Sequence, residues 1–396
     1  MPAINRIKKG SHFTQKSFPC SQCGANLVFC ADEDALKCSY CGYINKITPP
    51  PIPIEEYDFN DTVAKIESNA KLFVDKDHTI NCPSCGAGFE LKAHVRSTRC
   101  PYCHNPVVTN LDIFMPLAPE SLLPFDINQK DAKVIFKKWV GSLWFAPNEL
   151  KKFTKTEHNF QGIYLPYWTY DSQTTNHYKG QRGDIYYEKR YRRVYIEGRE
   201  RTIEESVAKI RWTPVRGTVR RYFDDVLIGA TLSIPRKLAD SLEPWDLENL
   251  EVYDEKFLSG FDSEVYQVSL DTGFEYAKQQ MEYIIREAVR YQIGGDQQQI
   301  TSLRIYHENT TFKYILLPIW TAHFKYKKKD YRFAINARTG VIKGERPYSK
   351  LKIFLLIFAI LVIVGGFLYF ADLEQIEDNF EYQSPQNPFH EVIILK

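Results

Sequence analysis

The chain has 396 residues, of which 44% are hydrophobic and 14% aromatic, and its formal net charge is +2 at pH 7. A chain of this length and composition can bury a sizeable core and predicts two or more domains, which excludes a largely disordered protein. Residues 1–110 carry twelve Lys and Arg against eleven Asp and Glu, before cysteine thiolates are counted. The N-terminal region is therefore a poor electrostatic surface for binding phosphate.

Eight of the nine cysteines form two cassettes with identical spacing, 62 residues apart. In each cassette, two CxxC pairs are separated by fourteen residues, an arrangement that brings four thiolates to one Zn²⁺ ion. The first set is Cys20, Cys23, Cys38 and Cys41, and the second is Cys82, Cys85, Cys100 and Cys103. We therefore predict zinc ribbons over residues 17–46 and 79–109, with one structural zinc ion each.

The residues next to the cysteines support the metal interpretation. Gly24, Gly42 and Gly86 directly follow the second cysteine of a pair, where a positive φ is commonly needed. His104 takes the fourth such place, either as an exposed turn residue or as an alternative ligand. Disulfides are the competing interpretation, but a long chain without a recognisable signal peptide favours a reducing compartment. Cys30, the ninth cysteine, is expected to be a buried structural thiol rather than a reactive one.

The two ribbons are separated by a Pro-rich linker with a short helix, residues 47–78. Pro49–Pro53 is expected to be a stiff, extended segment, and a helix is expected at about residues 62–70. This linker predicts two ribbons that can reorient independently of each other.

Residues 110–350 predict a duplicated, β-rich α+β domain, with halves at 110–235 and 236–350. The segment Ile163–Tyr170 resembles Ile315–Ala322, and each follows a helical segment. The first helix is expected to start at a cap provided by Asp126 or Asn128. The apolar stripes comprise Ala132, Ile135, Trp139, Val140 and Leu143 in the first half, and Phe274, Ala277, Met281, Ile284, Ile285 and Ala288 in the second. Trp168 and Trp320 are expected to be core anchors, with ligand stacking as the alternative.

Strand-like alternation covers residues 184–193, 211–221 and 323–335. Two basic clusters with interleaved tyrosines, within 189–201 and 325–332, lie in or beside these stretches. Each could be a solvated sheet face balanced by nearby glutamates, or a surface for single-stranded nucleic acid. Anionic lipid is a third possibility for the second cluster, because it lies about twenty residues before an apolar segment.

Sequence motifs for catalysis are not found. The chain has no HExxH, GxSxG, Walker-type or GxGxxG motif. Asp224 and Asp225 form a carboxylate pair that is expected to be a turn between strands rather than an acid/base pair. Because four cysteines fill each predicted zinc site, no coordination position is left for substrate. We therefore do not expect an enzyme.

Residues 353–371 contain no charged side chain and match the ~20 residues that span a bilayer. We predict a transmembrane helix over 351–372, with a buried core helix as the alternative. The basic residues Arg346, Lys350 and Lys352 precede it, and acidic residues follow it. The positive-inside rule then places the N-terminal body in the cytosol and a short acidic tail, 373–396, outside the cytoplasmic membrane.

Several sequence blocks carry a family resemblance. They are YLPYWTYD (164–171), WTPVRGTVRRYFDDVLI (212–228), LENLEVYDEKFLSGF (247–261), LLPIW (316–320) and INARTGVIKGERPYSKLKI (335–353). With the paired ribbons and the apolar segment, they resemble a bacterial family of membrane-anchored, TFIIB-type double zinc-ribbon proteins. Members are often labelled as the primosomal replication-restart helicase, but this chain lacks helicase motifs.

The resemblance implies an adaptor function. Similar proteins are linked in some bacteria with phage-shock-type membrane-stress proteins and flotillin-like SPFH proteins, which they help to hold at the membrane. We expect a non-enzymatic, membrane-anchored adaptor that recruits or organises cytosolic proteins and carries two structural zinc ions, with anionic lipid as a further partner. The alternative is a membrane-tethered zinc-ribbon protein that binds nucleic acid.

Overall fold

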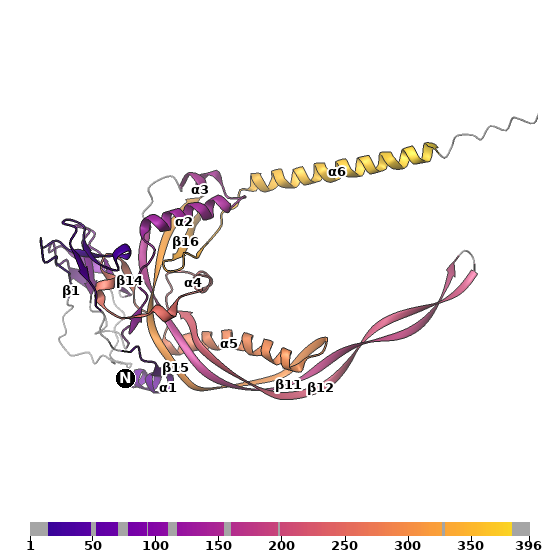
Figure 1. Ribbon diagram of the computed structural model, residues 1–396, viewed down its shortest axis with the longest axis horizontal. Helices are drawn as coiled ribbons and strands as arrows, with labels where there is room; N and C mark the ends of the chain where they lie inside the picture. Colours follow the sequence, from indigo (N-terminus) through magenta and orange to yellow (C-terminus); the bar gives the residue numbers. More distant parts are fainter. Residues whose placement is uncertain are drawn as a thin grey trace, which may run out of the picture. The chain divides into compact units, whose positions relative to one another are not determined.

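The computed structural model describes residues 15–48, 53–69, 78–92, 94–109, 117–153, 160–196, 199–326 and 329–381. These residues form the expected mixed α+β structure, with a twelve-stranded sheet as its largest element (Figure 1). The chain divides into two units, which we describe separately. The first consists of residues 1–136, 158–323 and 332–344, and the second of residues 137–157, 324–331 and 345–396.

The N-terminal cysteine-rich region consists of short strands and one helix. Its first elements are β1 (Gln15–Lys16), β2 (Leu27–Cys30), η1 (Ala31–Glu33), β3 (Ala35–Cys38) and β4 (Ile44–Lys46). These are followed by β5 (Tyr57–Asp58), α1 (Phe59–Asn69), β6 (His78–Asn81), β7 (Gly88–Leu91), β8 (Val95–Arg99) and β9 (Pro106–Thr109). Helix α1 lies close to where the sequence predicts it, whereas residues 49–52 of the Pro-rich segment lie outside the described residues.

The body of the protein contains three very long strands, β11, β12 and β15. Its first elements, in chain order, are β10 (Ser121–Leu122), α2 (Gln129–Ser142), α3 (Asn148–Phe153), β11 (Gln161–Ile196) and β12 (Arg199–Gly229). There follow α4 (Arg236–Asp240), η4 (Leu247–Asn249), β13 (Glu251–Val252), η5 (Glu255–Leu258), β14 (Asp262–Glu264) and α5 (Leu270–Ile293). The last elements are β15 (Gln297–Tyr326), β16 (Lys329–Asn336), β17 (Ile342–Gly344) and α6 (Lys350–Glu381).

The large sheet is organised around the antiparallel pair β11 and β15. Its order is β1-β9-β8-β14-β11-β15-β10-β13, with β12 beside β11, β5 and β16 beside β15, and β17 beside β16. Leu165 lies opposite Leu317, so the two LPxW motifs are paired with each other. Two smaller sheets, β2-β3-β4 and β6-β7, belong to the cysteine-rich region.

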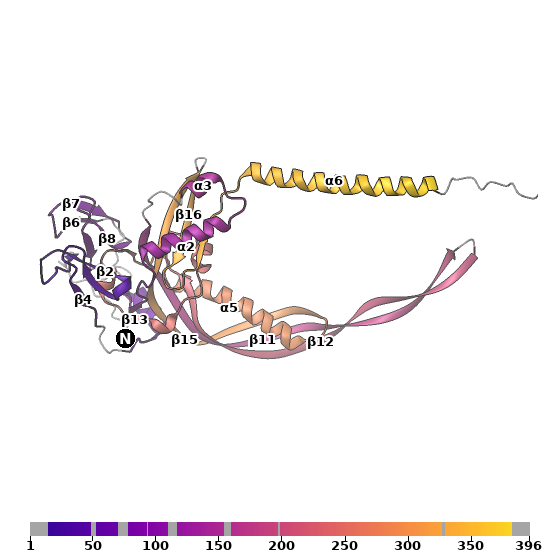
Figure 2. The same ribbon diagram turned by 45° about the horizontal axis from the view of Figure 1, so that its top comes forward.

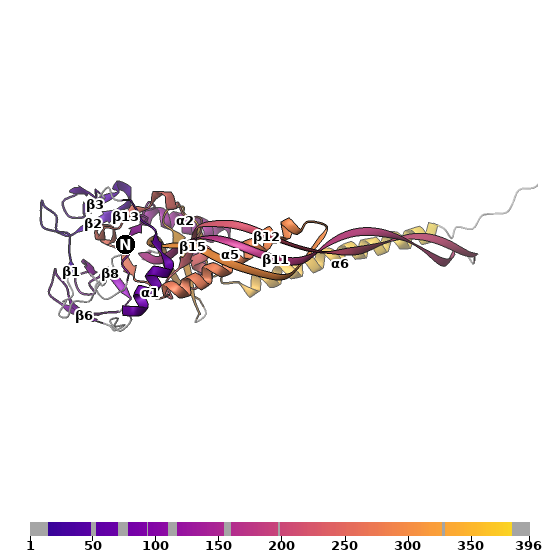
Figure 3. The same ribbon diagram turned by 90° about the horizontal axis from the view of Figure 1, so that it is seen from below.

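The two faces of the β11–β15 pair have different coverings. On one face Leu165, Leu317 and Ile319 pack in a core cluster with Leu242 and with Ala239 of α4. On the other face α5 lies along the sheet (Figures 2 and 3). Trp168 is fully buried and its Nε1 donates to the Val268 carbonyl at 3.0 Å, just before α5.

The tryptophan prediction is confirmed for both residues. Trp320 is also buried, and its Nε1 donates to the Ile127 carbonyl at 2.7 Å. Its ring lies 5.2 Å from that of Phe125. Both indole N–H groups are thus used inside the fold, as expected of core anchors.

The predicted helices form, with local corrections to their buried sides. Asn128 caps α2, because its Oδ1 accepts from the Asp131 amide at 2.9 Å. Phe136 is a buried residue of α2 that the predicted stripe omits. In α5 the prediction for Ile284 is wrong, since it is 43% exposed, and the buried stripe continues instead through Val289 and Ile293. The stripe follows a 3.6-residue repeat that turns Ile284 outward.

The two predicted halves share one sheet. The short strand before α2, β10, runs parallel to β15, and the short strand before α5, β14, runs parallel to β11. Each half therefore contributes a short strand beside the long strand of the other half. This reciprocal pairing is what a duplicated unit would produce, but the duplication itself stays a prediction.

The second unit contains α6. Lys350–Leu368 is long and apolar enough to cross a membrane by length and composition, with a mean hydropathy of 2.8 and none of it buried. The Lys352 ammonium donates to the Ala146 carbonyl at 2.7 Å, and Arg346 lies over the Trp139 ring. The helix continues to Glu381, so the first part of the predicted tail is helical, while residues 382–396 lie outside the described residues.

Candidate metal centres

All four CxxC turns have the same backbone geometry. In each turn the first cysteine donates its amide to the carbonyl five residues on, and its own carbonyl accepts from the residue that follows the second cysteine. That residue has a positive φ in every turn: 75° at Gly24, 76° at Gly42, 76° at Gly86 and 58° at His104. The tight turn points both sulfurs of a pair in the same direction, which explains the glycines seen in the sequence.

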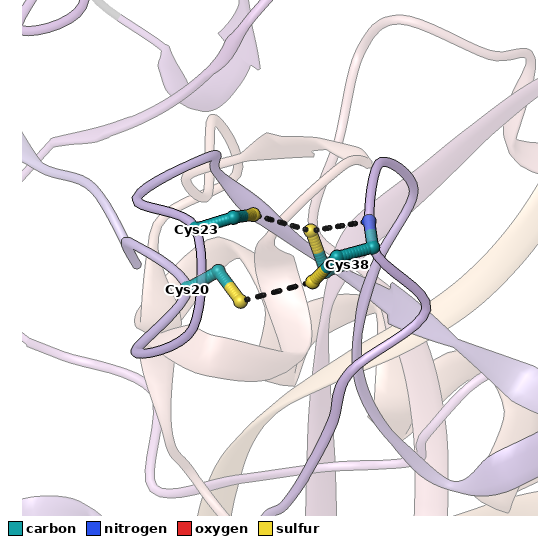
Figure 4. A group of neighbouring side chains, drawn as sticks. Cys20, Cys23 and Cys38 are labelled. Atoms are coloured by element: carbon teal, nitrogen blue, oxygen red, sulfur yellow. Dashed lines mark hydrogen bonds between the residues drawn. The ribbon is translucent and has the colours of Figure 1, made fainter.

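These turns bring each predicted set of four cysteines together. Within each set the sulfur atoms all lie within 4.8 Å of one another. The Cys20–Cys41 and Cys23–Cys38 sulfurs are 3.6 Å apart in the first ribbon. Figure 4 shows Cys20, Cys23 and Cys38 of this set. The corresponding Cys82–Cys103 and Cys85–Cys100 distances are 3.6 and 3.9 Å. Sulfurs bound tetrahedrally at the usual Zn–S distance lie about 3.8 Å apart, so both sets suit one zinc ion each.

The electrostatics of the first ribbon favour a bound cation. The Cys41 amide approaches the Cys38 sulfur at 3.5 Å and lowers the pKa of that thiol to about 6. The Tyr43 amide acts in the same direction on Cys41, but partial desolvation of the sulfur and the three neighbouring thiols raise the pKa of Cys41 to about 12. Four thiols this close cannot all ionise without a compensating charge, which a dication supplies.

His104 and Cys30 lie outside both ligand sets. His104 is exposed and belongs to the turn, so the prediction of a turn residue is confirmed. Cys30 is half-buried at the end of β2 rather than fully buried as predicted. Both residues line a cavity of about 700 Å³ that is also bordered by Phe261 and Trp320.

The first ribbon is fastened to the body, which contradicts the prediction of independently moving ribbons. The Phe29 amide donates to the Ser259 carbonyl at 2.9 Å, and the Ser259 hydroxyl donates to the Leu27 carbonyl at 2.8 Å. The Phe29 ring also packs 5.3 Å from that of Phe257. Sequence spacing cannot reveal such contacts, because their partners are more than 200 residues apart.

The second ribbon is part of the large sheet. Its strand β8 pairs with β14, and β9 pairs with β1. Val265 packs in a core cluster with Cys82 and Cys100. The two ribbons also touch each other, since the Asn26 side chain donates to the Ser84 hydroxyl at 2.8 Å. Both ribbons are therefore held on the segment Glu255–Val265.

A charge network lies at the bulges in the pairing of β11 with β12 and with β15. Lys313, only 8% exposed, forms ion pairs with Asp225 at 2.7 Å and with Glu56 at 3.1 Å. Asp171, 2% exposed, accepts from the Asp225 amide at 2.5 Å and from the Thr311 hydroxyl at 3.1 Å. Burial raises the pKa of Asp171 to about 6, with a further contribution from Glu56.

Asp224 and Asp225 correct another prediction. They do not form a turn between strands but lie within β12, at the bulge between the pairs Tyr170–Val226 and Ser172–Phe223, and Asp225 has a φ of 48°. Sequence analysis did not identify the charge network that Asp225 joins. The signal for it was Lys313 itself, a cation between Phe312 and Tyr314, directly before the uncharged run 314–320.

The fold and sites define an α+β protein with two zinc-ribbon metal centres and a candidate membrane helix. The chain is 24% identical over 338 residues to "Uncharacterized protein YdjG" of Bacillus subtilis (strain 168), an alignment that covers 85% of this chain and 92% of that protein. No family model matches the chain, and no solved structure matches it. Since the similarity covers most of both chains, it extends well beyond the cysteine cassettes.

Proposed function

We propose that this protein is a non-enzymatic adaptor, anchored in the cytoplasmic membrane by α6, which recruits or organises cytosolic proteins at the inner face. The observation that carries the proposal is the presence, in one chain, of two zinc sites with four cysteine ligands each and an apolar helix, Lys350–Leu368, none of which is buried. Such zinc sites are structural because all four coordination positions are filled by protein. The zinc ions then serve to stabilise the fold of the ribbons and the protein surface that the ribbons present.

The turns of the ribbons offer a surface for partner proteins. Tyr40 and Tyr102 occupy the same place in the second turn of each ribbon and are 85% and 66% exposed. A core role does not explain side chains this exposed, and tyrosine is enriched at protein interfaces. The family resemblance suggests phage-shock-type or SPFH-like membrane-stress proteins as the partners.

The test is cross-linking in intact membranes followed by purification of the full chain. We expect the variant Tyr40→Ala/Tyr102→Ala to keep its zinc and lose the cross-linked partners. The control is Tyr291→Ala, which removes a 91% exposed tyrosine from α5. Identical partners in all three proteins would contradict docking at the ribbons. Point variants are needed because removal of residues 1–110 would also delete strands of the large sheet.

Nucleic-acid binding is the second candidate function. The interleaving of tyrosine with arginine in residues 189–201 favours it. Titration of the full chain in detergent with single- and double-stranded DNA, over a range of salt concentrations, distinguishes the two functions. Tight binding with a steep salt dependence would support this candidate over the adaptor.

A further inference from the structure

The hairpin of β11 and β12 continues beyond the sheet as a two-stranded arm. The last pairing with β15 joins Gly183 to Gln297, and Asp296 closes the corner by accepting from the Ile185 amide at 2.6 Å. We define the arm as residues 184–196 and 199–211. Among the described residues no third strand pairs with it, and α5 ends at Ile293 (Figure 1).

An arm of this kind needs a partner surface. Twelve residue steps of extended chain span about 40 Å. An isolated two-stranded hairpin is only marginally stable in water. The register shows that the arm is regular, with Ile185 opposite Ile210 and Ile196 opposite Arg199. The chemistry of its side chains indicates what that surface is.

The two faces of the arm differ. Because side chains alternate along a strand, Tyr187, Tyr191 and Tyr195 share one face. They are 70%, 68% and 78% exposed. On the opposite face Arg190 and Arg192 lie beside two arginines of the partner strand, Arg199 and Arg201. The distal arm thus has a tyrosine face and an arginine face.

The cations of the tyrosine face form ion pairs, so the unpaired positive charge of the distal arm lies on the arginine face. On the tyrosine face, Lys189 pairs with Glu204 at 2.6 Å and Arg193 with Glu200 at 3.4 Å. In contrast, Arg192, Arg199 and Arg201 have no acidic partner among the described residues. Residues 189–201 contain six Lys and Arg against two Glu, and we call the described part of this stretch, 189–196 and 199–201, the tip. The tip therefore attracts anions.

We propose that the tip of the arm enters the headgroup layer of an anionic membrane. Tyrosine rings partition to this depth, and cytoplasmic-leaflet anionic lipids attract arginine. If the arm enters the layer tip first, headgroups surround both of its faces. Tyrosines and arginines on opposite faces can then both contact lipid. The proposal rests on the anchoring of α6 proposed above, because that anchor keeps a bilayer next to every copy of the chain.

The side-chain arrangement disfavours the other polyanion, single-stranded nucleic acid. A strand binds where aromatic rings and unpaired cations share one surface, so that bases stack while phosphates are neutralised. Here the unpaired arginines lie on the face opposite the tyrosines, and the cations Lys189 and Arg193 beside the tyrosines are already paired. Two arms that met through their arginine faces would repel each other.

Photo-cross-linking of the full chain in vesicles tests the proposal. The probe is p-benzoylphenylalanine in place of Tyr191, in vesicles of phosphatidylcholine alone or with about 30% phosphatidylglycerol. We expect lipid adducts in the anionic vesicles, at least about five-fold above the yield in neutral ones. The same probe in place of Tyr291, near the base of the arm, is expected to give few adducts.

Charge variants make the result specific. Arg192→Gln/Arg199→Gln/Arg201→Gln should reduce the adduct yield in anionic vesicles to that in neutral vesicles. Arg216→Gln/Arg220→Gln/Arg304→Gln removes three exposed arginines of the sheet and should leave the yield unchanged. Equal yields in both vesicles, cross-linked dimers without lipid adducts, or adducts only with added single-stranded DNA would overturn the proposal. Vesicle flotation separates the two hypotheses: a chain that floats without forming adducts contradicts only the arm, and one that does not float contradicts the anchor.

Discussion

The individual cysteines have unequal surroundings, although all eight are expected to bind zinc. The first cysteine of each pair, such as Cys38 or Cys100, is buried, whereas Cys23, Cys41 and Cys85 are exposed. The buried member contributes to the small ribbon core as well as to the metal site. Its loss should therefore be more damaging than a coordination argument alone suggests.

Substitution of one ligand should remove one zinc ion. We expect Cys38→Ser to contain one zinc per chain, because three thiolates bind Zn²⁺ far more weakly than four. Cys30→Ser is the control and should retain two, since Cys30 belongs to neither set. Elemental analysis of the purified proteins measures both values. Two zinc ions in Cys38→Ser would contradict the assigned ligands.

Asp171 makes stability depend on pH. Its pKa is raised in the folded protein to about 6 from an ordinary value of 3.8, mainly by burial. Its contribution to stability is therefore fully present below pH 3.8 and is lost as the pH rises through 6. We expect the stability of the native chain relative to Asp171→Asn to fall between pH 4 and pH 7.

Thermal unfolding of both proteins in detergent, in steps of pH, measures this difference. The comparison with the variant is needed because other groups titrate too: the pKa of Glu120 is raised to about 9, chiefly by burial, and the pKa of Glu56 is lowered. A difference between the two proteins that does not change with pH would show that Asp171 titrates normally.

At the scale of elements, local patterns predicted what local residues determine. The zinc-ligand sets, helix α1, the cap at Asn128 and most of the α5 stripe follow from spacing within one turn or one helix. The strands expected at 184–193 and 211–221 lie within β11 and β12. The full length of these two strands could not be predicted, because hydrophobic alternation marks a strand most clearly where one face is buried, and both faces of the arm are exposed.

The contact between the ribbons and the rest of the first unit could not be predicted from the sequence either, as Gly260 illustrates. It has a φ of 94°, and an added Cβ would lie 2.1 Å from Cγ1 of Val28 in the first ribbon. The position requires glycine because of a residue more than 200 positions away. Nothing within the neighbouring sequence indicates that requirement.

Gly260→Ala should loosen the first ribbon from the body. We expect a cost of about 2 kcal/mol from the left-handed backbone and the contact with Val28. Hydrogen exchange at the Phe29 amide should become faster, because that amide donates to Ser259. Gly141→Ala is the control: no atom lies within 4 Å of its Cβ, and alanine should stabilise α2 by about 0.5–1 kcal/mol. Unchanged exchange at Phe29 in Gly260→Ala would contradict a fixed ribbon.

At the scale of the whole molecule, the first unit joins both ribbons, the large sheet and the arm. The segment Glu255–Val265 holds the ribbons, and β11 runs from this region into the arm. The zinc ions are therefore expected to stabilise one end of a continuous structure. The second unit contributes α6, the helix that we propose as the membrane anchor.

The central claim is that a protein with two filled zinc ribbons is anchored in a membrane. Its most direct test is to mix the full chain, solubilised in detergent, with lipid, remove the detergent, float the vesicles and measure zinc and protein in the floating fraction. The account predicts that the chain floats, resists extraction by high salt, and contains two zinc ions per chain. A chain left in the dense fraction, or a floating chain with one zinc ion or none, would contradict it.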